Sequence, residues 1–321
     1  MNSFDIYKEY INTYENAISI MWKVFRKKEF IDVILKDHTK KKWPIVWVRN
    51  YAFIANLFPE KARKIEKLYD LIQINNHNNR DEFGEFIEFS YKNYKCKFYG
   101  IIEAGRIING DIEGVFFIEN YDFLEPFEGN TVIDIGANIG DSTIYFALNK
   151  ARRIISLEPF PFPYKFAKLN IAANNVKNKI ELLNAGYGKD FEVKVKNKKS
   201  KVDDILELSN DGKKINTYSL ATLINMFGLN DDSDLLLKMD CEGCEYNLLD
   251  EPVDVLRKFK RIALEFHYGY INLESKLEKA GFSVHHGKVL RSGCSEPSLK
   301  KMALANKDLT IGMIYAERRT I

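Results

Sequence analysis

Hydrophobic and polar positions follow different periods in different parts of this chain. In the N-terminal part, hydrophobic residues recur at helical spacing, which predicts an amphipathic helix over residues 4–37 and a second helix from near Pro59. The polar run 75–79 is typical of a linker. Residues 87–98 alternate hydrophobic and polar side chains around a Lys-Asn turn, and this pattern predicts a β-hairpin.

From Thr131 onward, short hydrophobic runs are separated by helical patterns. The runs cover residues 131–135, 154–158, 180–184, 234–239, 261–266, 282–286 and 308–316. Such alternation is typical of a doubly wound, mostly parallel sheet with helices on both faces. We therefore expect an α/β protein with three parts: a helical N-terminal region over residues 1–80, a β-hairpin and connector over 81–125, and an α/β domain over 126–321.

Composition narrows the class of protein. The chain has 321 residues, of which 45% are hydrophobic, and a formal net charge of +3. This near balance of charge gives no strong indication of a nucleic-acid partner. No hydrophobic stretch is long enough to span a membrane and no leader pattern is visible, so we expect a cytoplasmic protein. Four cysteines are too few for a disulfide scaffold, and reduced thiols are the expectation.

The residues after the first predicted strand of the α/β part form a glycine loop that leads into a helix. Asp134 lies at the end of the strand, Gly136 and Gly140 form the loop, and Asp141 suits the start of the helix. The loop differs from the G-x-G-x-x-G of dinucleotide enzymes, and Asp134 would repel a pyrophosphate. A cationic ligand without phosphate fits better, and S-adenosylmethionine, a sulfonium with an ammonium group, is the candidate.

Three further strand ends carry acidic or titratable residues. Glu158, about twenty residues past the loop, suits the two hydroxyls of a ribose. Asp240 ends the strand 234–239 and belongs to the same rim of the sheet. Glu265 and His267 alternate along a later strand and so share a face, where His267 is a reasonable proton acceptor. A structural loop histidine is an equally weighted alternative for His267.

Cys241 and Cys244 have the C-x-x-C spacing. A zinc site would need two further ligands, for which His285, His286 and Cys294 are the nearby options. The acidic neighbours Glu242 and Glu245 would raise the pKa of the thiols, which argues against a redox role. We therefore expect both cysteines to act as small buried hydrophobic residues.

Taken together and in this order, these motifs resemble the FkbM-type methyltransferases, a family of class I S-adenosylmethionine-dependent enzymes. The resemblance is carried by V-I-D-I-G-A-N-I-G-D at 132–141, L-E-P at 157–159, Asn170 with Asn174, Asn184-Ala185, K-M-D-C-E-G-C-E at 238–245 and E-F-H at 265–267. It implies a Rossmann-like, seven-stranded sheet with a terminal antiparallel strand. It also implies O-methylation of a hydroxyl on a sugar, glycoconjugate or small metabolite.

The resemblance also suggests roles for the site residues. Asp134, Gly136, Asn138 and Gly140 would shape the methionine end of the cofactor pocket, and Asp141 would also bind the cofactor. Glu158 would hold the ribose, and Asn184 would lie near the adenine. Asp240 would border both cofactor and acceptor. Asp240, Glu265 or His267 would act on the acceptor, with His267 the first choice of base. A divalent ion held by Asp240 and Glu265 is a second option, and a metal-free site is preferred.

Other classes of function stay open at this point. A dinucleotide oxidoreductase shares the sheet but lacks its glycine loop here. The main hypothesis is an enzyme that acts on a small-molecule or glycan acceptor. Two further alternatives are a methyltransferase-like scaffold without catalytic activity and an RNA or protein methyltransferase. The N-terminal helices, with Trp22, Trp43 and Trp47, are a candidate partner surface or homo-oligomer interface.

Overall fold

The computed structural model describes residues 3–75, 79–103, 106–107, 110–195, 213–230, 234–291 and 310–319. The middle of the predicted linker, the start of the last predicted strand and Cys294 lie outside these ranges. Within the described residues, no helix is both long and hydrophobic enough to cross a lipid bilayer.

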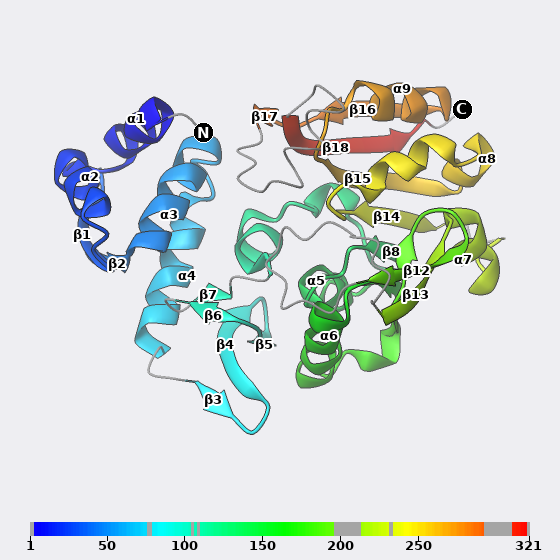
Figure 1. The fold of residues 1–321 in the computed structure, drawn as a ribbon, viewed down its shortest axis with the longest axis horizontal. Coiled ribbons are helices and arrows are strands. Elements are labelled where there is room, and N and C mark those ends of the chain that lie inside the picture. Colours follow the sequence, from blue (N-terminus) through cyan, green and yellow to red (C-terminus); the bar gives the residue numbers. More distant parts are fainter. Residues whose placement is uncertain are drawn as a thin grey trace.

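A mostly parallel sheet forms the centre of the C-terminal part (Figure 1). Its strands follow the order β10-β9-β8-β14-β15-β18-β16, and β17 adds to β18 beside this path. The bounds are β8 Thr131–Ile135, β9 Arg153–Leu157, β10 Ile180–Leu183, β14 Leu235–Met239, β15 Phe259–Phe266, β16 Phe282–His286, β17 Leu290–Arg291 and β18 Thr310–Arg318. Only β18 runs antiparallel to its neighbours β15 and β16 within this path. The predicted seven-stranded α/β sheet with a terminal antiparallel strand is confirmed.

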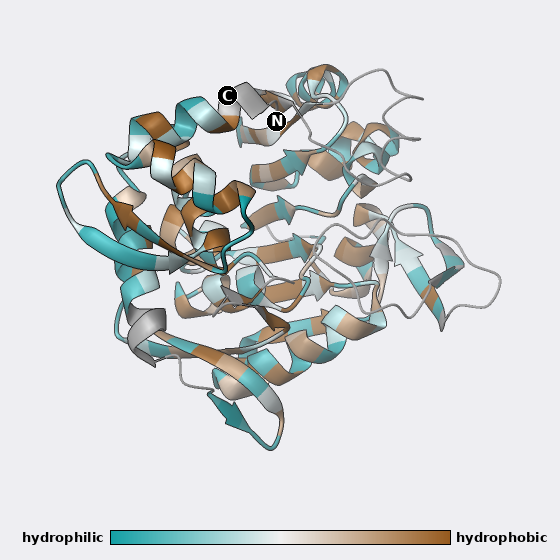
Figure 2. Cartoon of the chain, turned by 60° about the vertical axis from the view of Figure 1, so that its left-hand side comes forward, coloured by the Kyte–Doolittle hydropathy of each residue, from teal (hydrophilic) through white to brown (hydrophobic). Residues whose placement is uncertain are grey.

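Successive side chains on the central strands enter two different cores, because side chains alternate across a strand. Val132 and Leu236 pack with α5 (Asp141–Leu148) and α6 (Pro161–Ala173). Ile133 and Leu237 pack with the other layer, formed by α7 Leu220–Met226, η4 Cys244–Asp250, α8 Val253–Leu256 and α9 Ile271–Lys279. Figure 2, coloured by hydropathy, shows hydrophobic segments along the central strands and mixed hydrophobic and hydrophilic positions along the helices.

The N-terminal region differs from its prediction. Instead of one helix over 4–37, it contains α1 Ser3–Thr13, α2 Ala17–Phe25 and a hairpin of β1 Phe30–Ile34 and β2 Lys40–Pro44. The helix prediction was wrong beyond residue 25 because Ile31 and Val33 alternate with polar or exposed positions, the period of a strand. The predicted second helix is confirmed as α4 Ala62–Asn75, whereas α3 Ile45–Leu57 was not foreseen.

The predicted hairpin is confirmed as β4 Gly84–Tyr91 and β5 Tyr94–Tyr99. It is held to the α/β part by Asn170, whose amide exchanges hydrogen bonds with the backbone of Tyr99 and donates to the Ile139 carbonyl. The remaining short elements are β3 Arg80–Asp81, β6 Ile102–Glu103, β7 Arg106–Ile107, η1 Glu113–Ile118, η2 Asp122–Leu124, η3 Lys177–Lys179, β11 Gly186–Tyr187, β12 Phe191–Val195 and β13 Lys213–Tyr218. The expected division into three domains stays a prediction.

Candidate active site

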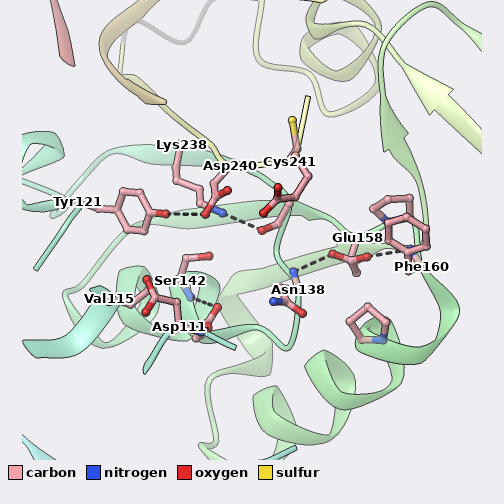
Figure 3. A pocket seen from close by; sticks show the side chains of 15 residues that line it. Asp111, Val115, Tyr121, Asn138, Ser142, Glu158, Phe160, Lys238, Asp240 and Cys241 are labelled. Atoms are coloured by element: carbon pink, nitrogen blue, oxygen red, sulfur yellow. Dashed lines mark hydrogen bonds between the residues drawn. The ribbon is translucent and has the colours of Figure 1, made fainter. Parts of the chain in front are cut away.

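A pocket opens at the carboxyl ends of β8, β9 and β14, the edge where ligands bind in doubly wound sheets (Figure 3). Its lining combines residues of the glycine loop, the two following strand ends and the segment before β8. These residues are Asp111, Val115, Tyr121, Gly136, Asn138, Asp141, Ser142, Glu158, Pro159, Phe160, Pro163, Lys238, Asp240, Cys241 and Glu242.

The glycine loop brings the ends of β8 and β14 into close contact. Gly136 has a φ of +81°, and a Cβ on this residue would lie 1.7 Å from the Asp240 carbonyl oxygen. Any side chain would therefore push the two strand ends apart. Asn138 also has a positive φ, of 47°. The left-handed backbone at these residues explains why this loop needs glycine and asparagine.

Asp134 lies beneath the pocket and does not line it. Its Oδ1 is 3.1 Å from Lys238 Nζ, and its Oδ2 accepts hydrogen bonds from Ser142 Oγ and Thr143 Oγ1. Lys238 also donates to the Gly136 carbonyl oxygen at 2.7 Å. The acid that the sequence assigned to the cofactor is therefore engaged with β14 and the start of α5, and it supports the loop from behind.

Glu158 lines the pocket, as expected for a ribose-binding acid. Its two carboxylate oxygens accept hydrogen bonds from the backbone amides of Asn138 and Phe160, each at 2.8 Å. Burial, opposed by these hydrogen bonds, raises the pKa of Glu158 to about 7. Asn184 is placed differently: its side-chain amide donates to the carbonyl oxygens of Glu158 and Pro159, and it does not line the pocket.

Acidic side chains dominate the lining of this pocket. Of the described residues that line it, five are Asp or Glu and one, Lys238, is basic. Asp111 donates its backbone amide to Asp141 Oδ2 at 2.7 Å. Asp111 is an exposed residue of the pocket lining, and partial loss of water around its carboxyl group, followed by the charge of Glu113, raises its pKa to about 7. The site therefore favours a positively charged ligand.

Asp240 is half-buried at the end of β14, in contact with Tyr121. The Tyr121 hydroxyl donates to Asp240 Oδ2 at 3.3 Å, and Lys238 Nζ lies 5.6 Å from the centre of the Tyr121 ring. Burial and then the charge of Asp240 raise the pKa of Tyr121 well above its usual value. Tyr121 is therefore a neutral hydroxyl that orients one oxygen of Asp240.

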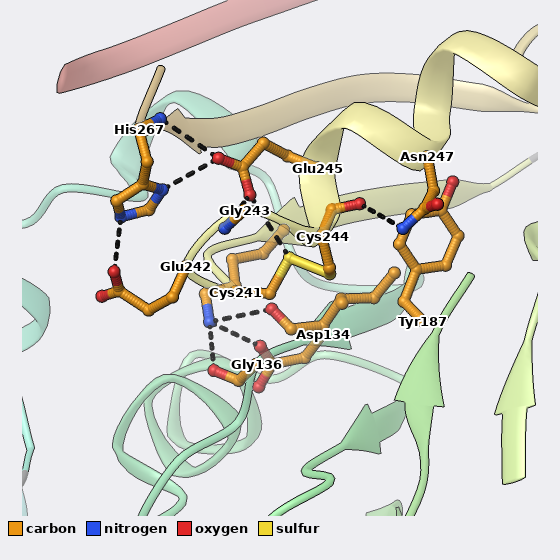
Figure 4. Close-up of a disulfide and its surroundings, with 12 residues drawn as sticks. Asp134, Gly136, Tyr187, Cys241, Glu242, Gly243, Cys244, Glu245, Asn247 and His267 are labelled. Carbon is orange, nitrogen blue, oxygen red and sulfur yellow. Dashed lines mark hydrogen bonds and ion pairs between the residues drawn. A yellow bond between two sulfur atoms is a disulfide. The ribbon is translucent and has the colours of Figure 1, made fainter. Parts of the chain in front are cut away.

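His267 is buried between two carboxylates, outside the lining of the pocket (Figure 4). Its Nδ1 lies 2.9 Å from Glu245 Oε1 and its Nε2 lies 3.2 Å from Glu242 Oε2. Burial alone would lower the pKa of His267, but the charge of Glu245 and the contact with Glu242 raise it well above its usual value. An imidazolium with both nitrogens engaged is a poor base, so this geometry argues against the expected role.

Glu265, the other expected acceptor-side residue, is half-buried and also lies outside the pocket lining. Burial, followed by the charge of Asp240, raises its pKa well above the usual value. The residues best placed to hold a metal ion are instead Asp240, Glu242 and His267, whose ligand atoms lie within 4.8 Å of one another. Oxygen and imidazole ligands suit a divalent ion, but here His267 already offsets the charge of Glu242.

Cys241 and Cys244 form a disulfide, which corrects the expectation of reduced thiols packed as hydrophobic residues (Figure 4). The intervening turn brings their Cα atoms to 5.5 Å, within the range of a disulfide. Both side chains are half-buried, and Cys241 borders the pocket. Cys96 is free and buried.

The structure thus brings together Gly136, Asn138, Asp141, Glu158 and Asp240 as expected. Gly140 has a φ of +87° and caps α5, but it does not line the pocket. Sequence reasoning missed Asp111, Tyr121 and Phe160. The sequence did offer a weak signal for Phe160, since an aromatic residue two positions after Glu158 could contact a base.

Residues 134–284 match the family model described as Methyltransferase FkbM domain, which confirms the resemblance seen in the sequence. No curated protein matches the chain significantly. Precorrin-6y C5,15-methyltransferase from Geobacter metallireducens is a similar solved structure, with 16% identity and a TM-score of 0.36 over 69% of this chain and 95% of that one. Methyltransferase FkbM from Methylobacillus flagellatus shows 16% identity and a TM-score of 0.36 over 58% of this chain and 43% of that one.

Proposed function

Because the chain carries a methyltransferase domain of the FkbM family, we propose that it is an S-adenosylmethionine-dependent methyltransferase. We propose further that it methylates a hydroxyl group of a sugar, glycoconjugate or small metabolite. The choice of a hydroxyl acceptor rests on the family resemblance, because fold alone does not choose a substrate.

The acidic lining of the pocket is the observation that carries the cofactor proposal. Five carboxyl groups face one lysine, and the ammonium group of that lysine lies against Asp134. A pyrophosphate would meet repulsion here, whereas a ligand with a sulfonium and an ammonium group would meet attraction. This charge pattern supports S-adenosylmethionine over a dinucleotide.

Several residues fit the parts of this cofactor. Asp141 and Asp240, with the backbone around Gly136, are suited to the methionine end. Glu158 retains carboxylate lone pairs beyond the two that its backbone partners use, so it can still accept from ribose hydroxyls. Phe160 borders the same side of the pocket and offers a ring to the adenine.

When bound, S-adenosylmethionine supplies a methyl group on a sulfonium sulfur that an oxygen nucleophile can attack. The protein then has to align the acceptor and receive the proton of its hydroxyl. Asp240 is the best-placed group for that proton, because it lines the pocket and Tyr121 donates to one of its two oxygens, Oδ2. In this proposal His267 holds Glu242 and Glu245 in place and does not take the proton.

Calorimetry with the full chain tests the cofactor proposal. We expect binding of S-adenosylmethionine and S-adenosylhomocysteine and no binding of NAD. Glu158→Gln should weaken the binding by about 10- to 100-fold, because the amide cannot accept from both backbone donors and a diol. Glu278→Gln, an exposed residue of α9, is the matched control and should bind normally. Absence of binding by the wild-type chain would refute the proposal.

A panel of hydroxyl-bearing acceptors tests the catalytic part. Asp240→Asn should lower kcat more than it changes acceptor KM, because the amide cannot take the proton. Activity should persist in EDTA. If EDTA abolishes the activity and a divalent ion restores it, the result would instead support a metal ion at Asp240, Glu242 and His267. Cofactor binding without turnover on any acceptor would favour a non-catalytic scaffold.

A further inference from the structure

Helix α2 exposes an unusual hydrophobic face. Ile18, Trp22 and Phe25 are 75%, 57% and 80% exposed, and their spacing places them on one side of the helix. The opposite side carries Ala17 and Ile20, which are buried. Of the ten large hydrophobic residues found exposed in the described part of the chain, six lie between Tyr7 and Phe30. Exposure concentrated in this way is typical of an interaction surface.

Basic residues lie at the C-terminal end of this hydrophobic face. Arg26, Lys27 and Lys28 follow Phe25 directly and are all exposed. The guanidinium group of Arg26 lies 4.5 Å from the centre of the Trp22 ring. Residues 17–42 contain eight Lys or Arg and three Asp or Glu, so this segment is more positive than the whole chain with its net charge of +3. We call Ile18, Trp22, Phe25, Arg26, Lys27 and Lys28 the α2 surface.

We propose that the α2 surface docks on an anionic lipid bilayer, with Trp22 and Phe25 entering the interface and the basic residues meeting the lipid head groups. Tryptophan prefers the membrane interface, and a helix with hydrophobic residues on one side and basic residues beside them binds there without spanning. A second copy of the chain is a poorer occupant, because a two-fold contact would bring the same basic residues face to face. The helix lies at the edge of the molecule, far from β8, so this docking does not depend on the proposed function (Figure 1).

Tryptophan fluorescence of the full chain gives a direct test. The chain has three tryptophans, and Trp43 and Trp47 are 0% and 1% exposed, so only Trp22 can move from water to lipid. Vesicles of phosphatidylcholine with phosphatidylglycerol should shift the emission to shorter wavelength and sediment the protein. Vesicles of phosphatidylcholine alone should do so much less, and salt should release the protein.

Two pairs of substitutions separate the hydrophobic contribution to lipid binding from the electrostatic one. Trp22→Ser with Phe25→Ser, and Lys27→Glu with Lys28→Glu, should each weaken sedimentation with anionic vesicles by at least about tenfold. Ile271→Ser and Lys279→Glu are matched controls on α9, where both residues are exposed, and they should bind normally. No sedimentation of the wild-type chain with anionic vesicles would overturn the proposal. So would a concentration-dependent blue shift without lipid, which would identify a second copy as the occupant.

Discussion

Lys238 and Asp134 form a buried ion pair beneath the pocket, with Nζ 3.1 Å from Oδ1 and with 2% and 0% of the two side chains exposed. The pair connects β14 to β8, and through Ser142 and Thr143 it also connects β8 to α5. These three elements carry the glycine loop and Asp240. The ion pair therefore holds together the framework from which the pocket is built.

Replacement of Lys238 should destabilise the fold strongly. Lys238→Met leaves Asp134 charged, buried and without its cation, and we expect the free energy of unfolding to fall by about 3–5 kcal/mol. Urea denaturation measures this change. Lys279→Met, at an exposed position of α9, is the control and should change stability by less than about 0.5 kcal/mol. The double variant Lys238→Met with Asp134→Asn should recover part of the loss, and no recovery would contradict the assigned pairing.

His267 should remain protonated through the neutral range. Its pKa is raised well above the usual value because the charges of Glu245 and Glu242 outweigh the effect of burial. NMR can follow its ring resonance, assigned by its absence in His267→Gln. We expect no titration between about pH 5 and about pH 8, whereas an ordinary histidine titrates near 6.5. A midpoint in the neutral range would restore His267 as a candidate base.

The same shift predicts how stability depends on pH. A histidine whose pKa is raised by folding contributes fully to stability below its unfolded pKa, near 6.5, and that contribution is lost as pH rises toward the folded value. The free energy of unfolding should therefore decline above about pH 6.5, by up to about 1.4 kcal/mol per pH unit. Urea denaturation across this range should show a shallower decline for His267→Gln than for the wild-type chain.

The sequence predicted the rim of acids because of a general property of parallel sheets. Strands that run in the same direction bring their carboxyl ends to one edge, so Glu158 and Asp240 could be placed near the loop of Gly136 without a structure. Asp111 and Tyr121 could not be found in this way. They precede β8 in segments without a recognisable motif, and only tertiary packing brings them to the pocket.

The side chains that contact the charged residues could also not be predicted from the sequence. The spacing along β15 placed Glu265 and His267 on one face, but it gave no sign that Glu245, 22 residues before His267, contacts its ring. Likewise, Asp134 looked like a ligand-binding acid because nothing in the sequence pairs it with Lys238. In both cases a long-range contact changes the chemistry of the residue.

Alkylation should confirm the disulfide between Cys241 and Cys244. In denatured but unreduced protein, mass spectrometry should find Cys96 modified and the peptide containing residues 241–244 unmodified. Reduction before alkylation should modify both cysteines of that peptide. Because the closed loop is short, Cys241→Ser with Cys244→Ser should lower the free energy of unfolding by only about 2 kcal/mol. Free thiols at both positions without reduction would contradict the structure.

Binding of the proposed cofactor should weaken in acid. The pKa of Asp111 and that of Glu158 are both raised to about 7, so both carboxyl groups take up protons as pH falls below neutrality. A cationic ligand favours their ionised forms, while its own amino group stays protonated below about pH 7.7. Between about pH 7 and about pH 5 the affinity for S-adenosylmethionine should therefore fall by at least about tenfold. Calorimetry in buffers of different ionisation enthalpy should show proton release on binding at the lower pH. Cofactor binding to the Glu158→Gln variant should release fewer protons than binding to the wild-type chain. An affinity independent of pH would mean that the ionisation of these two carboxyl groups is not coupled to cofactor binding.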